Sequence, residues 1–380
     1  MNVEKIRGDF SVLKKDIIYF DSACMSLKPK SVVNKIIEYY KEYPSCAGRS
    51  VHRFGIKLDE EINSSRKLVQ KFIGAKKSNE VIFSKNATES INLIANSFKF
   101  DKVLVSDREH NSNLIPWQKF KYGVLKSKKD FTFDLEKFSE AVKNYDFVSF
   151  VHTSNFDGYT LPVKEIVKIA HENKAKIHLD AAQAVPHKEV NVKKLGVDFL
   201  TFSGHKMLGP TGTGALYANE NILEDMKPFL VGGETVIDSS YDGHVLEELP
   251  NRFEAGLQNY AGILGFGEAV KYLKKIGMDD IEAHEKKLVK EVDVPGAEQV
   301  GFRGERGIFN FNLPKIDAHE VAGILSSSKD IMLRSGMHCA HSWYNTQNLK
   351  GSVRASFYLY NTIEEVKVFN AELAKLMKLS

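Results

Sequence analysis

Short hydrophobic runs recur along the first part of the chain, and each one closes on polar residues. The runs Val81–Ser84, Phe147–Val151 and Phe199–Phe202 are continuous rather than alternating, which is typical of strands buried on both faces of a parallel sheet. Between such runs the apolar positions take helical spacing, as in Val163–Glu172. This repeated order of strand and helix predicts an α/β fold with a mostly parallel sheet flanked by helices.

The same pattern predicts the other elements of this region. Gly214–Ala218 follows Phe199–Phe202 after a glycine-rich loop, and we expect it to pair antiparallel to that strand. Further strands are expected at Ile17–Phe20, Val103–Val105 and Ile177–Leu179, and helices from Pro29 to Tyr43 and from Gly55 to Phe72.

The pattern changes after Pro250–Gly256, where the segments become long, charged and helical. Helices are expected at Ala261–Lys275, Met278–Glu291 and Ile363–Leu379, and strands near Ile308–Leu313, Ile331–Arg334 and Val353–Tyr360. We therefore predict a large α/β domain over residues 21–258 and a small α+β domain formed by residues 1–20 and 259–380.

Composition narrows the class of protein. The 380 residues exceed one ordinary core, and contents of 43% hydrophobic and 27% charged residues are globular values. No apolar run approaches the roughly 20 residues of a membrane span, and the charged N-terminal segment lacks the apolar centre of a secretory signal. The net charge of +4 is spread without a basic block. We therefore expect a cytoplasmic protein with no membrane or nucleic-acid partner.

Candidate chemistry gathers where two strands end. Asp180 follows Ile177–Leu179 and Lys206 follows Phe199–Phe202, so both would face one crevice at the carboxyl edge of a sheet. A lysine in such a place is most often a solvated surface charge. Lys206, however, stands in SGHKMLGPTGTG, where small residues let the backbone approach a ligand and leave the amine free to form a Schiff base.

The helix that follows Val81–Ser84 adds an anion site. Its first turn, near Thr88, presents unpaired backbone N–H groups that favour a phosphate, although Thr88 taken alone is more simply read as a helix cap. A carboxylate such as Asp180 keeps a pyridine nitrogen protonated. Together with Lys206, these features predict one cofactor, pyridoxal 5'-phosphate (PLP).

Six segments then carry a family resemblance: HLDAAQAV (178–185), FSGHKMLGPTGTGALY (202–217), EHNSNLIPWQ (109–118), RFEAG (252–256), RSGMHCA (334–340) and RASFYLYNT (354–362). They resemble the fold-type I, class V PLP-dependent enzymes, and within these the cysteine desulfurases and selenocysteine lyases. The similarity runs from about Tyr19 to Glu365. It implies the fold-type I PLP transferase-like architecture and a homodimer with sites at the interface.

The resemblance implies a role for each matching residue. Lys206 would bind PLP and later move the Cα proton, Asp180 would pair with the pyridinium nitrogen, and His110 would stack on the ring. Arg354 would clamp the substrate carboxylate with its guanidinium fork. The remaining cofactor contacts would be Asn155 and Gln183 at the ring oxygen, and Ala87, Thr88, Ser203 and His205 at the phosphate.

The three cysteines, Cys24, Cys46 and Cys339, fit neither a zinc site nor a disulfide framework, so no metal is expected. Cys339 lies in a polar segment with two potential cations nearby, Arg334 and His338, which would favour its thiolate. The resemblance places it as the nucleophile that attacks the substrate sulfur. Cys24 lies in DSACMSLKP, which borders the site in the family and makes it a candidate substrate contact. A structural role is the simpler reading for Cys24 and Cys46.

The chain departs from the family pattern in three places. Asn86-Ala87-Thr88-Glu89 replaces a common Gly-Thr-Thr-Glu, and Leu257-Gln258 follows RFEAG where Thr-Pro is common. The loss of both hydroxyls either loosens phosphate binding or leaves it to backbone N–H groups. Met337 stands where a histidine often precedes the His-Cys pair, which changes how the thiol would be activated.

These expectations combine into a PLP-dependent cysteine desulfurase that converts L-cysteine to L-alanine and takes the sulfur as a persulfide on Cys339, for iron-sulfur cluster or other sulfur-cofactor assembly. A sulfur-acceptor protein would discharge it. One alternative is another class V activity, such as selenocysteine lyase, epimerase or aminotransferase, because only Cys339 points to sulfur. The other is a non-catalytic sulfur-relay or regulatory scaffold.

Overall fold

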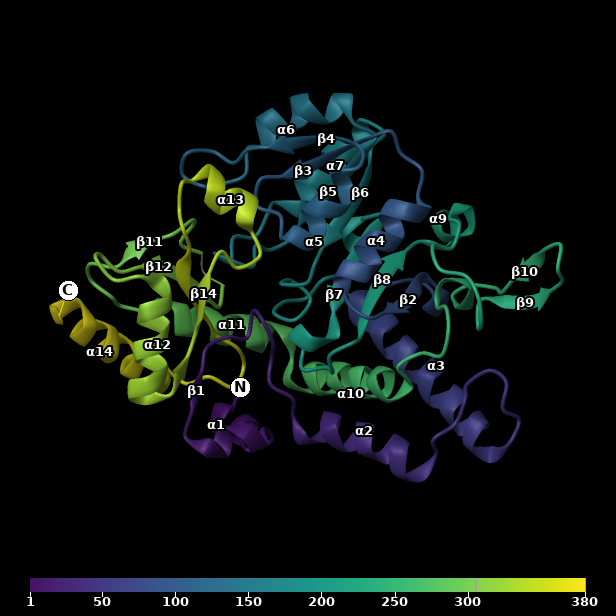
Figure 1. Cartoon of the computed structure of the whole chain (residues 1–380), viewed down its shortest axis with the longest axis horizontal. Coiled ribbons are helices and arrows are strands. Elements are labelled where there is room, and N and C mark those ends of the chain that lie inside the picture. The colour runs from purple at the N-terminus through teal and green to yellow at the C-terminus, as the bar shows by residue number, and fades with distance from the viewer. Residues whose placement is uncertain (305, 380) are drawn as a thin grey trace.

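The computed structural model describes residues 1–304 and 306–379, and a seven-stranded sheet of order β2-β8-β7-β6-β5-β3-β4 forms its centre (Figure 1). Among these strands only β8 runs antiparallel to its neighbours, so both the mostly parallel sheet and the antiparallel pairing of β8 with β7 are confirmed. The strands are β2 (Val81–Ser84), β3 (Lys102–Ser106), β4 (Lys121–Leu125), β5 (Phe147–Val151), β6 (Lys176–Asp180), β7 (Phe199–Ser203) and β8 (Gly214–Ala218).

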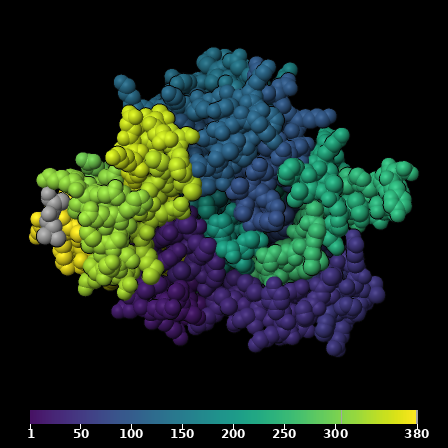
Figure 2. All heavy atoms as spheres, in the orientation of Figure 1, coloured from purple at the N-terminus to yellow at the C-terminus, as the bar shows by residue number. Residues whose placement is uncertain are grey.

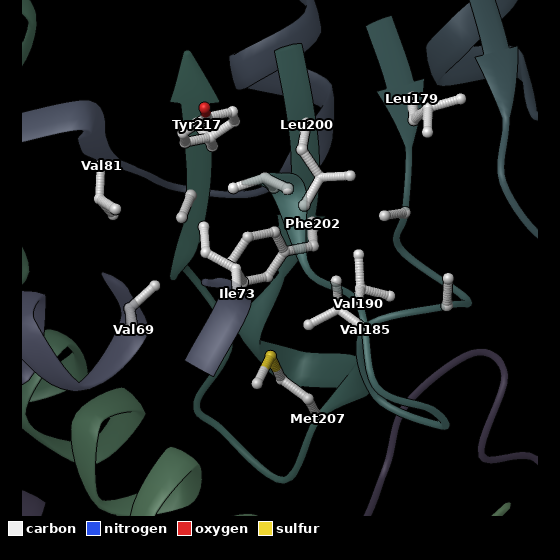
Figure 3. Packing of buried hydrophobic residues seen from close by; sticks show 14 of the residues in the cluster. Val69, Ile73, Val81, Leu179, Val185, Val190, Leu200, Phe202, Met207 and Tyr217 are labelled. Atoms are coloured by element: carbon white, nitrogen blue, oxygen red, sulfur yellow. The ribbon is translucent and has the colours of Figure 1, made fainter. Parts of the chain in front are cut away.

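Both faces of the central strands are buried, because a separate hydrophobic core covers each face of the sheet. Successive side chains of a strand point to opposite faces and therefore pack in different cores. In β7, Leu200 and Phe202 belong to the core that includes α3, whereas Phe199 belongs to the core that includes α4. Figure 3 shows Phe202 close to Ile73 of α3. The helices of this part are α2 (Lys30–Glu42), α3 (Arg53–Ile73), α4 (Ala87–Ser97), α5 (Asn111–Leu114), α6 (Leu135–Ala141), α7 (Val163–Glu172), α8 (Val192–Leu195), α9 (Glu220–Asp225) and α10 (Tyr260–Ile276).

A second, smaller unit has its own four-stranded sheet of order β11-β12-β15-β14 and its own core (Figure 1). The N-terminal strand β1 joins this unit by pairing in parallel with β13. Its elements are β1 (Ile18–Tyr19), β11 (Glu298–Gln299), β12 (Ile308–Asn312), β13 (Ile331–Met332), β14 (Arg334–Gly336), β15 (Ser352–Ser356), α11 (Met278–Lys290), α12 (Ala318–Lys329), α13 (His341–Thr346) and α14 (Ile363–Leu379). The N-terminal helix α1 (Val3–Arg7) contacts α14 through Arg7 and Glu365 but buries Ile6 in the core of the large sheet.

Helix α10 lies where the predicted domains meet. It packs against α2 and α3, and its residues Ile263 and Phe266 belong to the core of the large sheet. The division at residue 258 stays a prediction, and this packing favours counting α10 with the large domain.

Two strands expected in the small unit differ in the structure. Ile331–Arg334 was expected as one strand, but β13 and β14 belong to different sheets. The strand expected over Val353–Tyr360 ends at Ser356, because Phe357–Tyr360 is buried in irregular backbone, where Tyr358 N donates to the side chain of Asn361. An apolar run shows burial, and burial alone does not distinguish a strand from a packed turn.

Other strands were not predicted, because their side chains are mostly exposed and so leave no apolar pattern in the sequence. The edge strand β4 is mostly exposed, and the hairpin of β9 (Val236–Ser239) and β10 (His244–Leu246) extends away from both units (Figure 1). Neither gives the alternation that marks a half-buried strand. Within residues 1–304 and 306–379, no helix has both the length and the apolar content needed to cross a bilayer.

A buried ion pair holds α3 against the segment that follows β10. The guanidinium of Arg66 donates to both carboxylate oxygens of Glu254, at 2.6 and 2.9 Å, and to the carbonyl of Val81 at 2.8 Å. Glu254 also accepts from the backbone N–H of Phe83. Arg66 and Glu254 are both buried, so removal of one leaves the other charge without a partner and out of water.

We expect Arg66→Met to lower the free energy of unfolding by about 3–5 kcal/mol, because Glu254 would keep a buried charge. Urea titrations followed by circular dichroism measure this loss. The matched control is Lys143→Met, which removes an exposed pair with Glu140 and is expected to change stability by no more than about 0.5 kcal/mol. Equal effects of the two substitutions would contradict the structural role of the Arg66–Glu254 pair.

Candidate active site

One cavity lies at the carboxyl ends of the central strands, where the large sheet meets β14 and β15. Figure 2 shows the surface hollowed near the middle of this face, where N-terminal, central and C-terminal segments come together. Of the residues predicted for the site, Cys339 is outside the cavity lining, although it contacts Arg334, which does line it. The others all line the cavity: Cys24, Ala87, Thr88, His110, Asn155, Asp180, Gln183, Ser203, His205, Lys206 and Arg354.

Asp180 and Lys206 lie at the ends of the neighbouring parallel strands β6 and β7, as the strand pattern predicted. Asp180 is buried, and one of its carboxylate oxygens accepts from Ala182 N at 3.0 Å. Burial raises the pKa of Asp180, and the nearby Lys206 opposes that rise. Burial likewise lowers the pKa of Lys206, which Asp180 opposes. The amine of Lys206 is therefore neutral at lower pH than an ordinary lysine, as Schiff-base chemistry requires.

The N-terminus of α4 supplies a cluster of donors. Asn86 caps the helix, because its side-chain oxygen accepts from Glu89 N at 3.0 Å, so the reading of Thr88 as the cap is wrong. The hydroxyl of Thr88 instead lies 2.7 Å from that of Ser112, which also lines the cavity and which the sequence analysis missed. The N–H of Ala87 donates to the Ser203 hydroxyl at 2.9 Å. Hydroxyls and helix N–H groups thus converge where a phosphate was predicted.

His110 lies after β3 with its ring held by the backbone. Its Nδ1 accepts from Ser112 N at 3.0 Å, which caps α5 and fixes the ring orientation. Burial, reinforced by the positive charges of Lys206 and Arg334, lowers the pKa of His110 to about 3. The ring is therefore neutral near pH 7, which suits a flat stacking surface rather than a cation.

Four cavity-lining side chains have polar atoms without a partner in the part of the chain that the structure describes. They are Asn155 Oδ1, Gln183 Oε1, His338 Nδ1 and Arg354 Nε, and all four residues are buried. Buried polar atoms in native proteins are almost always paired, so unpaired ones that line a cavity point to a polar ligand. Two amide oxygens that can accept from a ring hydroxyl, Asp180 for a ring nitrogen and Lys206 for an aldehyde fit the PLP expected from the resemblance.

Arg354 lies on β15, between β12 and β14 of the small-unit sheet. It donates to Asn155 O at 2.8 Å and forms an ion pair with Asp21 at 3.1 Å. Its buried guanidinium lines the same cavity as Lys206, and its positive charge helps to lower the pKa of Lys206. A guanidinium with an unpaired nitrogen in this place is suited to a substrate carboxylate.

Arg334 is the cation beside the thiols. One terminal nitrogen donates to Cys339 Sγ at 3.4 Å and the other to Cys24 Sγ at 2.9 Å. The prediction of His338 as a second cation near Cys339 is wrong. Burial lowers the pKa of His338 to about 2, and its Nε2 pairs with the Ser352 hydroxyl. Met337 packs against a small cluster that includes Phe156, Trp343 and Tyr344.

The loop from Asp21 to Ser26 joins the two units at the cavity. Ala23 N donates to the Ser356 hydroxyl at 3.0 Å on the small-unit side. On the other side the Ser26 hydroxyl donates to His205 O and accepts from Leu208 N. Cys24 is therefore held between fixed points of both units.

We expect the carbon-bound ring protons of His110 in the apoprotein to keep a constant NMR shift from pH 5 to pH 8, because the pKa of His110 is lowered to about 3. In urea the same ring should titrate near pH 6.5. Since the unfolded chain then binds the extra proton and the folded chain does not, this residue lowers stability progressively as pH falls below about 6.5. A folded-state titration near pH 6.5 would refute the charge assignment.

Comparison with known proteins gives consistent results across the whole chain. The sequence matches the family model described as Aminotransferase class-V over residues 18–369. A probable cysteine desulfurase of Pyrococcus abyssi is 39% identical over 394 aligned positions, which cover 99% of this chain and 98% of that protein. A cysteine desulfurase of Escherichia coli O8 is 34% identical over 405 positions, which cover 100% and 99%.

Solved structures of the same kind match the fold. The apo structure of a cysteine desulfurase from Thermococcus onnurineus superposes with a TM-score of 0.96 at 39% identity, covering 100% of this chain and 99% of that one. A cysteine desulfurase of Escherichia coli in an S-sulfonic acid form gives a TM-score of 0.93 at 27% identity, with the same coverage.

Proposed function

The chain belongs to the aminotransferase class V family, and from that premise we propose that it is a PLP-dependent cysteine desulfurase that converts L-cysteine to L-alanine. The observation that carries the proposal is the single cavity in which Asp180, Lys206 and Arg354 face a cation, Arg334, that contacts Cys339. The first three residues serve a bound amino acid, and the contact with Cys339 adds a nucleophile for sulfur.

When bound, PLP supplies an electron sink that makes the Cα–H bond of an amino acid acidic. Asp180 would hold the ring nitrogen protonated, because its carboxylate is buried beside it with few competing donors. Neutral His110 would cover the ring face, and Asn155 and Gln183, whose amide oxygens are free to accept, would lie at the ring hydroxyl. Lys206 would hold the cofactor and then, as a neutral amine, move the proton at Cα.

The residues of the small unit would act on the substrate. Arg354 would bind the substrate carboxylate through its unpaired nitrogen. Arg334 would lie against the Cys339 sulfur as it attacks, and its guanidinium stays charged at any pH of interest. The Cys339 sulfur would then bond to the substrate sulfur as the substrate Cβ–S bond breaks, which leaves a persulfide on Cys339 and a carbon skeleton that departs as alanine.

We further propose a cytoplasmic homodimer that passes sulfur to an acceptor protein for iron-sulfur cluster or other sulfur-cofactor assembly. Exposed apolar side chains support the dimer: Phe229, Leu230 and Leu257 line a second cavity next to the RFEAG segment. Such a patch is typical of a protein interface.

We expect Cys339→Ala to abolish the formation of sulfide and alanine from L-cysteine, because no other residue is proposed to attack the substrate sulfur. The same variant should still bind PLP and show its absorbance, whereas Lys206→Ala should lose the absorbance that depends on the lysine. Sulfide and alanine assays with L-cysteine measure the outcome. Wild-type rates in Cys339→Ala would disprove the persulfide mechanism.

Arg354→Lys should raise KM for L-cysteine about 10-fold to 100-fold, because it replaces a fork of charge-assisted hydrogen bonds with a single ammonium. The matched control is Arg303→Lys, a conservative change in the small unit at a side chain that donates to Val292 O, and it should leave KM unchanged. Steady-state kinetics separate KM from kcat. An unchanged KM in Arg354→Lys would remove Arg354 from the substrate site.

A further inference from the structure

Two thiols share one guanidinium beside the cavity. Cys24 Sγ and Cys339 Sγ accept from different terminal nitrogens of Arg334, at 2.9 and 3.4 Å. The two sulfurs are therefore separated by no more than the width of a guanidinium group and two hydrogen bonds, although the cysteines are far apart in the sequence. The third cysteine, Cys46, is exposed and has no part in this arrangement.

The shared cation acts on both sulfurs. Burial opposes the charge of Arg334, but Cys24, Cys339 and Asp21 together outweigh that effect and raise the pKa of Arg334 above its usual value. Because arginine keeps its charge, negative charge that develops on either sulfur during a reaction lies against a cation. If sulfur passed between Cys339 and Cys24, the guanidinium of Arg334 would stabilise both the attacking sulfur and the leaving sulfur.

The two cysteines differ in where they face. Cys24 lines the cavity with Lys206 and Arg354, whereas Cys339 is outside the lining and reaches Arg334 from the turn after β14. Cys24 is also fixed by its backbone, since Cys24 N donates to Asp21 O at 3.1 Å and the preceding N–H of Ala23 binds Ser356. A cysteine that only filled space would need neither the cation nor a place in the cavity wall.

We propose that Cys24 is a sulfur-relay residue, which accepts the outer sulfur atom of the persulfide on Cys339. The proposal rests on the desulfurase function proposed above. The thiolate of Cys24 attacks the outer sulfur, a new S–S bond forms at Cys24, and the S–S bond at Cys339 breaks with its electron pair returning to Cys339 as thiolate. One S–S bond replaces another, so the step needs no oxidant or reductant.

Arg334 favours attack on the outer sulfur over attack on the inner one. Attack on the outer sulfur expels the Cys339 thiolate, which leaves directly into its contact with the guanidinium. Attack on the inner sulfur would instead expel hydrosulfide and form a disulfide between Cys24 and Cys339. The relay frees Cys339 for a second substrate while the first sulfur stays on the enzyme.

The test is the burst of alanine from holoenzyme mixed with excess L-cysteine, without an acceptor protein or added reductant. The unsubstituted protein should release two equivalents of alanine per chain in the burst, because Cys339 is freed once, and Cys24→Ser should release one. Cys46→Ser is the matched control and should still release two. A burst of one equivalent in the unsubstituted protein would overturn the relay.

The position of the sulfur gives a second measurement that does not depend on a variant folding. After the burst, alkylation and peptide mass spectrometry of the unsubstituted protein should find one added sulfur on the Cys24 peptide as well as on the Cys339 peptide. Cys339→Ala should carry none on Cys24. Added sulfur on Cys339 alone, a Cys24–Cys339 disulfide, or labelled Cys24 in Cys339→Ala would each overturn the relay.

These results separate the two proposals. If the unsubstituted holoenzyme releases no alanine from L-cysteine, the desulfurase function fails. If alanine is released and added sulfur is found on Cys339 but never on Cys24, the function stands and the relay fails.

Discussion

The chemistry of the cavity depends on two opposite charges, Asp180 and Lys206, that are buried together. Asp180 and Lys206 are each disfavoured as ions by burial, and each offsets part of the other's cost. Neither would remain charged at the end of a buried strand alone. The parallel pairing of β6 with β7 brings both ends to the same edge of the sheet, so the electrostatics of the site follows directly from strand order.

The small unit contributes two arginines, Arg354 and Arg334, whose positive charges have different kinds of partner. Arg354 pairs with Asp21, and Arg334 has two thiols in place of a carboxylate partner. The carboxylate binding proposed for Arg354 and the thiol chemistry proposed near Arg334 therefore depend on β14 and β15, whereas the cofactor residues proposed above lie mainly around the large sheet. The large sheet positions the residues that would bind the cofactor, and the small sheet positions the arginines that would act on the substrate carboxylate and on the thiols.

Much of this was predictable because burial and strand ends leave marks in the sequence. Continuous apolar runs located β2, β5 and β7, and the polar residues that close such runs pointed to Asp180 and Lys206. The bridge from Arg334 to Cys24 was not predictable, since it needs the turn after β14 and the N-terminal loop to meet in space. The uncharged state of His338 was likewise decided by burial in the folded chain, which a linear pattern does not contain. The capping role of Asn86 is different, because its contact with Glu89 N is local and an Asn followed three residues later by a Glu is a readable cap signal.

The parallel pairing of β1 with β13 has a consequence for biosynthesis. The ribosome releases Asp21 and Cys24 early, but their partners Arg354 and Arg334 emerge only after most of the chain has been made. The large sheet contains all its strands by Ala218 and can collapse first, as domains do during synthesis. Cys24 therefore has no guanidinium contact through most of translation, and the thiol pair is among the last features of the nascent protein to form.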